Sequence, residues 1–194
     1  MTERVLDLWG DVADPWSYIA KRRVEAAIAA SERPADVVLL HHALPRGPVS
    51  SEDLQRASVV ARPDGIDIAA AAPPAGDTTD AHRLVALGLA LGGPPLQGAM
   101  LERLYAAAFT EALDVRSSAV LQRIATEAGL DGHRVAAVLA STDHAADVAS
   151  DVALAQELGI TGTPHLVVDH RIGLGGPASV EDYVELLDGS GDTS

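Results

Sequence analysis

Near the N-terminus, two apolar runs of strand length lie on either side of a single helix. Val5–Trp9 and Val37–Leu44 are rich in Val and Leu and predict strands. Between them, Asp14 suits the N-cap and Pro15 the first position of a helix that runs to about Ala30. A strand, a helix and a strand in succession form a βαβ unit, whose strands are normally parallel and whose crossover is right-handed. The chain is therefore predicted to build an α/β fold around this pair.

A helical block follows the βαβ unit. From Asp80 to Leu158, apolar residues recur with the 3.6-residue period of a helix and predict several helices in succession. The preceding residues 46–77 contain Pro and Gly clusters, which favour a connecting loop with at most one short helix, near 51–60. We therefore expect an all-helical insertion domain at 78–159, reached through a connecting loop region at 46–77.

The C-terminal part returns to the α/β pattern. Two short strands are predicted at 165–169 and 171–174, and a closing helix follows from Ser179 to Leu187. Residues 160–188 would thus join residues 1–45 in one domain, with the helices inserted between the two pieces.

Three stretches resemble the cytoplasmic DsbA-like family that includes FrnE-type proteins. Asp14–Arg23 resembles its Cys-Pro-Trp-Cys-Tyr-Ile-Gly-Lys-Arg segment, Ala81–Leu84 its Ala-His-Arg segment, and Glu157–His165 its Gly-Val-x-Gly-Val-Pro segment, in which the proline is cis. The same superfamily includes 2-hydroxychromene-2-carboxylate isomerases and kappa-class glutathione transferases, which carry a serine motif such as Ser-Pro-Tyr-Ser. The resemblance implies an α/β thioredoxin fold whose central mixed β-sheet is interrupted by the all-helical insertion domain.

The chain contains no cysteine, and Asp14 occupies the first position of the motif that it resembles. Disulfide exchange requires a thiolate, so this chain cannot perform it. A glutathione thiolate within about 4 Å of Asp14 would face a like charge, which raises the pKa of the thiol. Kappa-type thiol activation is therefore disfavoured unless Ser17 has taken over the donor role. We predict no cofactor, with glutathione or another low-molecular-weight thiol as the disfavoured alternative.

The net charge of −14 argues against nucleic acid and anionic membranes as partners, because both require a positive surface. The longest apolar stretch, Leu84–Gly93, is well short of the roughly 20 residues that span a bilayer. Residues 1–9 carry scattered charges and do not resemble a secretory signal. We therefore expect a soluble cytoplasmic protein with a small-molecule substrate, and the resemblance adds a homodimer as an open expectation.

Asp14 and Ser17 each allow two interpretations. Asp14 is either a structural N-cap, worth about 1 kcal/mol, or a carboxylate that the helix N-terminus keeps ionised as a catalytic base. Ser17 is either a hydrogen-bond donor in the site or an ordinary exposed polar residue. Both are candidate catalytic residues.

Three histidines are further candidates. His41 and His42 are neighbours on a strand, so their side chains point to opposite faces and cannot converge on a metal. The resemblance places the end of this strand near the active-site helix, so either one is a candidate catalytic acid or base. His82, in the helical block, either binds substrate or only caps and packs. No metal site is predicted.

The resemblance also implies that a cis-proline loop lies against the first turn of the active-site helix. Thr163, before Pro164, would offer its backbone groups to a ligand, and His165 would form part of the wall. Trp16 either lines an apolar pocket or covers the core. These four residues are candidate substrate-binding residues.

The sequence favours a redox-inactive, DsbA-like isomerase of a small, largely apolar, conjugated substrate. Double-bond or tautomeric isomerisation would proceed by acid–base chemistry, with Asp14 paired to one of His41, His42 or His165. Analogy with relatives adds secondary metabolism and a polyketide or polyene intermediate as the setting. Two alternatives stay open: a non-catalytic thioredoxin-like protein that binds a ligand or partner, and a glutathione-dependent transferase or isomerase of the kappa-class type.

Overall fold

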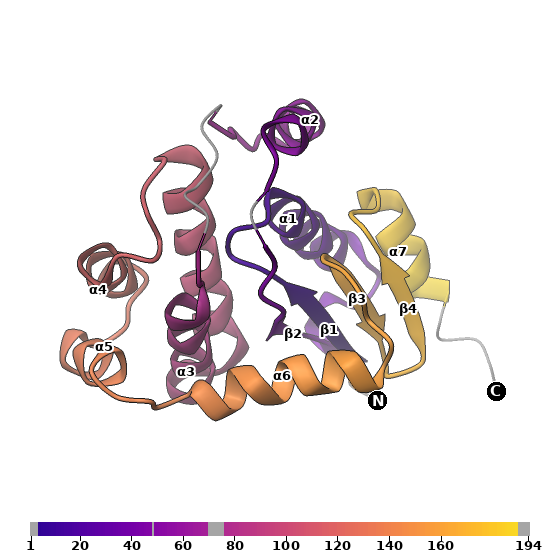
Figure 1. Cartoon of the computed structure of the whole chain (residues 1–194). Helices are drawn as coiled ribbons and strands as arrows, with labels where there is room; N and C mark the ends of the chain where they lie inside the picture. Colours follow the sequence, from indigo (N-terminus) through magenta and orange to yellow (C-terminus); the bar gives the residue numbers. More distant parts are fainter. Residues whose placement is uncertain (1–3, 48, 70–75, 190–194) are drawn as a thin grey trace.

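The computed structural model describes residues 4–47, 49–69 and 76–189. Figure 1 shows a small sheet flanked by helices on both faces, with a group of helices to one side. The strands are β1 Arg4–Gly10, β2 Val37–Ala43, β3 His165–Val168 and β4 Ile172–Gly175. The helices are α1 Pro15–Ala30, α2 Ser51–Ala61, α3 Thr79–Tyr105, α4 Ser118–Glu127, α5 Gly132–Leu139, α6 Ala145–Glu157 and α7 Val180–Gly189. Short 3₁₀ turns lie at Pro34–Asp36 and Arg62–Asp64, and a π-helical turn, Ala106–Thr110, ends α3.

The sheet is mixed and has the strand order β2-β1-β3-β4. β1 pairs in parallel with β2, as the βαβ pattern predicts, and antiparallel with β3, which pairs antiparallel with β4. Leu8 lies opposite His41 and Trp9 lies opposite His42. The edge strand β2 therefore presents its last residues toward the helical group.

Two layers of helices cover the sheet (Figure 1). On one face, α1 and α7 pack on Leu6 and Leu8 of β1 and Leu166 of β3, all of which are buried. On the other face, the end of α6 packs on Trp9 and Val167. The alternation of strand residues between the two faces thus fills two separate apolar layers.

The largest apolar cluster joins α1 to the helices of the inserted region, α3, α4 and α5, which we call the helical group. It contains Tyr18 and Ile19 of α1 together with buried residues of α3, α4 and α5. The short helix expected near 51–60 is α2, which adds Leu54 and Ala57 to the same cluster. One continuous core therefore joins α2 to the helical group.

Helix α3 consists of two helical segments that meet at Gly93. This glycine has φ 66° and ψ −163°, and Pro94 and Pro95 open the second segment, as the sequence predicts. By length and apolar composition alone, Thr79–Thr110 is the one candidate membrane span in the described part of the chain. Leu84 and Met100 are completely buried in the apolar cluster, and the break at Gly93 interrupts the segment, both of which suit a core helix.

Other helix starts differ slightly from their predicted positions. The N-cap of α3 is Thr78 rather than Asp80. By residue type Asp143 suits the N-cap of helix α6, but the N-cap is His144, which adopts φ 64°. Arg83, buried inside the helical group, donates to the carbonyl oxygens of Val138, Ser141 and Asp143. This side chain fixes the link between α5 and α6 against α3.

Candidate active site

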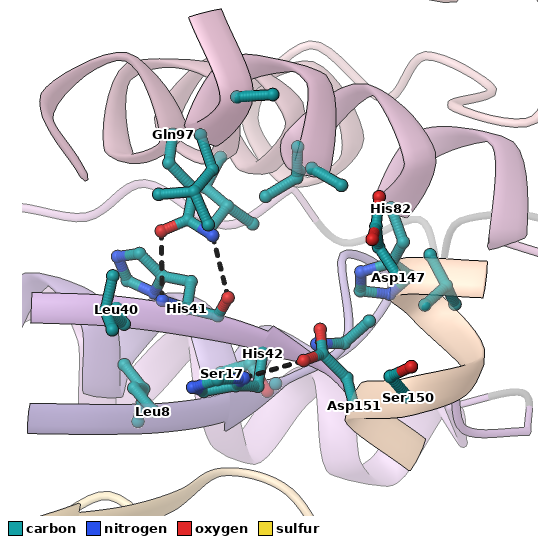
Figure 2. A pocket seen from close by; sticks show the side chains of 18 of the residues that line it. Leu8, Ser17, Leu40, His41, His42, His82, Gln97, Asp147, Ser150 and Asp151 are labelled. Atoms are coloured by element: carbon teal, nitrogen blue, oxygen red, sulfur yellow. Dashed lines mark hydrogen bonds and ion pairs between the residues drawn. The ribbon is translucent and has the colours of Figure 1, made fainter. Parts of the chain in front are cut away.

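A cavity of about 330 Å³ lies between β2, α3 and α6, with the start of α1 behind it (Figure 2). Its body is apolar and is formed largely by Leu40, Val85, Leu89, Leu101 and Val148. The polar side chains that line it are Ser17, His41, His42, His82, Gln97, Tyr105, Asp147, Ser150 and Asp151. An apolar cavity of this size with a few convergent polar groups is typical of a small-molecule site.

Ser17 connects this cavity to Asp14. Its side chain is 1% exposed, so the interpretation as an ordinary exposed residue is wrong. The Ser17 hydroxyl donates to Oδ2 of Asp14 at 2.7 Å, and Oγ accepts a weaker bond from the backbone N–H of Asp11 at 3.3 Å. Its burial arises because the first turn of α1 packs under Tyr105 of α3, close to Gly10. A serine three residues after the N-cap thus becomes a wall of the cavity.

Tyr105 contributes a phenol beside Ser17. Burial raises the pKa of Tyr105 well above its usual value, and the negative charges of Asp14 and Asp11 raise it further, against an opposing effect of a hydrogen bond with Ser17. The phenol therefore stays protonated at physiological pH, and a ligand in the cavity can accept its hydrogen bond in place of Oγ of Ser17. Tyr105 and Ser17 together form the polar end of the cavity.

Asp14 is a structural cap whose carboxylate is fully engaged within the protein. Oδ1 accepts from the backbone N–H of Trp16 at 3.2 Å, and Oδ2 accepts from the hydroxyls of Ser17 and Thr163 at 2.7 and 2.9 Å. Burial raises the pKa of Asp14, while these hydrogen bonds and the charge of Arg46 oppose that rise. Asp14 does not line the main cavity, and it contacts a ligand there only through Ser17.

Asp11 and His82 form a buried pair on the opposite wall. His82 is 4% exposed and its Nε2 lies 3.1 Å from Oδ1 of Asp11, which also accepts from the hydroxyl of Thr78 at 3.0 Å. Burial would raise the pKa of Asp11, but the bonds to His82 and to the backbone of Arg46 and Ala13 lower it. The carboxylate therefore stays ionised and holds the imidazole with Nε2 as donor. Nδ1 of His82 has no hydrogen-bond partner in the described part of the chain.

His42 is held between two carboxylates. Its Nδ1 lies 2.7 Å from Oδ1 of Asp151 and its Nε2 lies 2.8 Å from Oδ1 of Asp7, while the ring stacks on Trp9 with centroids 4.4 Å apart. Burial lowers the pKa of His42, but the two carboxylates outweigh it and raise that pKa to about 9. Because both ring nitrogens are bound, His42 is an imidazolium that ties α6 to the sheet. Its predicted catalytic role stays a prediction.

His41 points to the other face of the sheet and is neutral. Burial lowers its pKa to about 3, with further contributions from the positive charges of Lys21 and His42. Its peptide group is held by the side-chain amide of Gln97, which donates to the carbonyl at 2.8 Å and accepts from the N–H at 3.1 Å (Figure 2). The predicted divergence of His41 and His42 is confirmed. An acid–base role for His41 stays a prediction.

The cis-proline loop lies against the active-site helix, as the resemblance implies. The bond between Thr163 and Pro164 is cis, and the Thr163 hydroxyl binds Asp14. The Thr163 carbonyl accepts from Arg46 at 3.3 Å, so a ligand would have to compete for it. His165 covers β4, since a Cβ atom added at Gly173 would meet its Nε2 at 3.0 Å.

The predicted site residues therefore divide into three groups. Ser17, His41, His42 and His82 line the main cavity. Asp14 and Trp16 line a second hollow of about 330 Å³ with Arg46. Thr163 and Pro164 lie behind Asp14, and His165 lines neither hollow among the pockets described.

Sequence analysis missed Asp11, Tyr105 and Gln97. Asp11 had a usable signal, because polar residues directly after the carboxyl end of a parallel strand often lie at the binding crevice. Tyr105 is one of few aromatic residues in a chain that is only 3% aromatic, and this rarity was a weaker signal. Gln97 had none, since its partner is the backbone of a residue far away in sequence.

A mixed sheet with an inserted helical group, and a cis-proline loop on the N-terminus of the first helix, together define a thioredoxin-like protein of the DsbA type. The sequence matches the DSBA-like thioredoxin domain family over residues 5–188, and the chain belongs to this family. A search of the curated proteins gives no match.

Solved structures agree with this assignment. A probable DsbA oxidoreductase from Streptomyces coelicolor is 27% identical, with a TM-score of 0.86 over 98% of this chain and 92% of that one. A cytosolic disulfide reductase, DsbM from Pseudomonas aeruginosa, solved with GSH, is 20% identical, with a TM-score of 0.71 over 94% and 96% of the two chains. A 2-hydroxychromene-2-carboxylate isomerase is 16% identical, with a TM-score of 0.72 over 96% and 93%. The last two show the fold alone.

Proposed function

We propose that this protein is a redox-inactive isomerase that moves a proton within a small, largely apolar, conjugated carbonyl compound. The observation that carries the proposal is the convergence of Ser17, Tyr105 and the Asp11–His82 pair on one apolar cavity. One structural neighbour is an isomerase, and this chain has no thiol with which to follow the oxidoreductases. A polyketide or polyene intermediate in secondary metabolism, a cytoplasmic location and a homodimer stay predictions.

In the proposed reaction, the substrate carbonyl oxygen accepts a hydrogen bond from Tyr105, next to Ser17. Nδ1 of His82 removes a proton from the carbon next to the conjugated system, the C–H electron pair shifts toward the carbonyl, and a dienol or dienolate forms. His82 then returns a proton from Nδ1 to another carbon, so no oxidant or reductant is needed, and exchange of that Nδ1 proton with solvent introduces deuterium in D₂O. The carboxylate of Asp11 stabilises the imidazolium that forms between the two proton transfers.

This assignment changes the roles that the sequence favours for Asp14. Because Asp14 is bound by Trp16, Ser17 and Thr163, it acts on a ligand only by orienting the Ser17 hydroxyl. In the proposal it is a positioning residue, and His82 is the base.

The test is turnover of a panel of β,γ-unsaturated and α,β-unsaturated ketones, followed by ultraviolet absorbance and by deuterium uptake from D₂O. We expect His82→Gln to lower kcat by about a hundredfold or more, which is the scale of a general base. Tyr105→Phe should lower it by about tenfold or more, because one hydrogen bond to the developing oxyanion is lost. His133→Gln, on the exposed face of α5, is the matched control and should leave the rate unchanged. Equal rates in all four proteins would reject the roles of His82 and Tyr105.

A second candidate function is ligand binding without catalysis. The observation that favours it is the saturated carboxylate of Asp14, which suits a cap as well as a positioning residue. Binding of the panel compounds without isomerisation or deuterium exchange would establish this alternative.

A glutathione-dependent activity is the third candidate, favoured by the neighbour solved with GSH. Against it, no Lys or Arg lines the main cavity to bind the carboxylates of glutathione, and the one Arg of the second hollow, Arg46, lies beside Asp14. Calorimetric titration with glutathione decides this case, and absence of binding at millimolar concentration would remove it.

A further inference from the structure

The walls of the main cavity carry negative charge, and this bears on the substrate class. Resting on the function proposed above, we propose that the cavity selects a conjugated carbonyl compound that carries a protonated amine over its uncharged analogue, and rejects the corresponding carboxylate.

Among the charged side chains around the cavity, carboxylates outnumber cationic groups. Asp147 and Asp151 line it, and Asp7 and Asp11 lie directly behind the lining residues His42 and His82. Within the part of the chain that the structure describes, no Lys or Arg lines the cavity. Lys21, on the far side of β2, is 2.8 Å from Glu102 and 2.9 Å from Glu25, so its charge is already compensated.

The imidazolium of His42 does not reverse this balance. It lies between Asp7 and Asp151 at 2.8 and 2.7 Å, so one positive charge faces two negative ones. Both of its ring nitrogens are bound, which leaves no N–H to donate to a ligand carboxylate. The group that could best have bound an anion is therefore occupied.

Asp147 provides a position for the ammonium group. It lies at the cavity on α6, the helix that also carries Ser150 (Figure 2), and its side chain is 63% exposed. Oδ2 lies 2.7 Å from Nδ1 of His144, while Oδ1 has no hydrogen bond in the described part of the chain. A cation whose apolar body lies against Val85 and Leu89 could thus bind Asp147 with its charged end.

Two observations within the cavity point to the same ligand site. Tyr105 lies at the inner end, and the charges of Asp14 and Asp11 add to burial in raising its pKa, which indicates a negative potential there. His82 is 4% exposed, lines the cavity, and leaves Nδ1 without a partner among the described residues. The site thus has a negative field and, on a buried side chain, a ring nitrogen that no hydrogen bond among the described residues occupies.

Three compounds that share one conjugated ketone skeleton test the charge preference: benzylideneacetone that carries an aminomethyl, a carbamoyl or a carboxylate group at the para position of its ring. Dissociation constants measured by calorimetry at pH 7 and low ionic strength should fall in the order amine, amide, carboxylate from tightest to weakest. We expect the amine to bind at least about tenfold more tightly than the carboxylate, because a tenfold ratio is 1.4 kcal/mol, which is less than two unit charges about 6 Å apart contribute at an effective dielectric constant of 20.

Asp147→Asn should reduce the ratio of amine to carboxylate affinity by about threefold or more, since it removes one carboxylate at the cavity and keeps the shape. Glu157→Gln, an exposed carboxylate at the far end of the same helix, is the matched control and should leave the ratio unchanged. In 0.5 M salt the ratio should shrink, because screening weakens the interaction at the exposed Asp147.

Equal affinities for the three compounds, or tighter binding of the carboxylate, would overturn the charge preference. The isomerase proposal would survive that result, because it depends on the His82 and Tyr105 rates. No binding of any of the three at millimolar concentration would overturn the charge preference together with the use of this cavity for conjugated compounds.

Discussion

At the scale of single residues, the site depends on one carboxylate that replaces the usual first residue of the motif. Asp14 accepts three hydrogen bonds, from the backbone of Trp16 and from the hydroxyls of Ser17 and Thr163. A cap with one bond stabilises a helix by about 1 kcal/mol, and leaving a buried hydroxyl without its acceptor costs about as much again. Asp14 therefore joins three separate elements and does more than begin a helix.

We predict that Asp14→Ala lowers the free energy of unfolding by about 2–4 kcal/mol, because one cap and two buried hydroxyl bonds are lost together. Asp131→Ala is the matched control, since Asp131 is an exposed N-cap that accepts one bond from Arg134 at 3.0 Å. Its loss should cost about 1 kcal/mol. Urea denaturation of both variants measures the difference, and equal costs would show that the bonds to Ser17 and Thr163 contribute nothing.

The two adjacent histidines predict opposite pH dependences. The pKa of His42 is about 9 in the folded protein against 6.5 ordinarily, so its stabilisation is complete below about pH 6.5 and is lost as the pH rises through 9. The full effect corresponds to about 3 kcal/mol. The pKa of His41 is about 3 in the folded protein, so below about pH 6.5 the imidazole is protonated in the unfolded chain but stays neutral in the folded one. The folded state therefore becomes less stable as the pH decreases from 6.5 toward 3.

Urea denaturation between pH 4 and pH 10 should therefore show maximal stability near pH 6.5. His42→Asn should remove most of the decline on the alkaline side, and His41→Leu should reduce the decline on the acid side. A stability that is constant from pH 6.5 to pH 9.5 in the unmodified protein would contradict the assignment of His42 as a clamped imidazolium.

Sequence reasoning reached Asp14 as a cap because capping is a local pattern. It misjudged Ser17, whose burial depends on Tyr105, a residue far along the chain in α3. It could not assign His42, because Asp7 and Asp151 come from different elements. Local chemistry was therefore predictable, and partnerships between distant residues were not.

At the scale of elements, α3 shows how one glycine sets the geometry of the cavity wall. Val85 and Leu89 come from the segment before Gly93, and Gln97 and Leu101 come from the segment after it. The chain at Gly93 has φ 66° and ψ −163°, a region that is open essentially to glycine alone. The change of direction between the two segments therefore depends on that residue.

We predict that Gly93→Ala lowers the free energy of unfolding by about 1–3 kcal/mol through backbone strain. Gly98→Ala, within the second segment, is the matched control: an added Cβ would meet only Oε1 of Glu25, at 3.8 Å. That variant should be neutral or slightly stabilising, because Ala favours helix over Gly. Thermal and urea denaturation compare the two, and a Gly98→Ala variant that is the less stable would contradict this account.

The predicted elements agree closely with those observed, since strands, helix caps and Gly or Pro breaks are local signals. The π-helical end of α3 and the left-handed His144 at the start of α6 were not predicted. Both depend on how the helical group closes around its core, which single-sequence patterns do not contain.

At the scale of the whole molecule, one apolar cluster crosses the predicted domain boundaries. It joins α1 of the sheet region, α2 of the connecting region and α3 to α5 of the helical group. α6 adds a second attachment through Asp151, which binds His42 and the backbone of Ala43. The helical insertion is therefore integrated with the sheet.

We predict a single cooperative unfolding transition. Trp9 fluorescence reports the packing of α6 on the sheet, and far-ultraviolet circular dichroism reports mainly the helical group. The urea midpoints from the two probes should coincide, because the shared core links both regions. Trp16→Phe makes the fluorescence specific to Trp9, and two separate midpoints would show that the regions unfold independently.

The order of elements and the mixed sheet were predictable because each follows from local patterns and from the resemblance. The cavity was predictable only in outline. Its walls come from β2, α3 and α6, and their side chains meet through tertiary packing rather than through spacing in the sequence.

The amide of Gln97 has a consequence for self-assembly. By donating to the carbonyl of His41 and accepting from its N–H, it imitates one residue of a fifth strand beside β2. An exposed strand edge is the usual template for sheet growth between copies of a protein. Another chain that paired with β2 would first have to displace this side chain. Gln97 therefore blocks the sheet edge and opposes aggregation by strand addition.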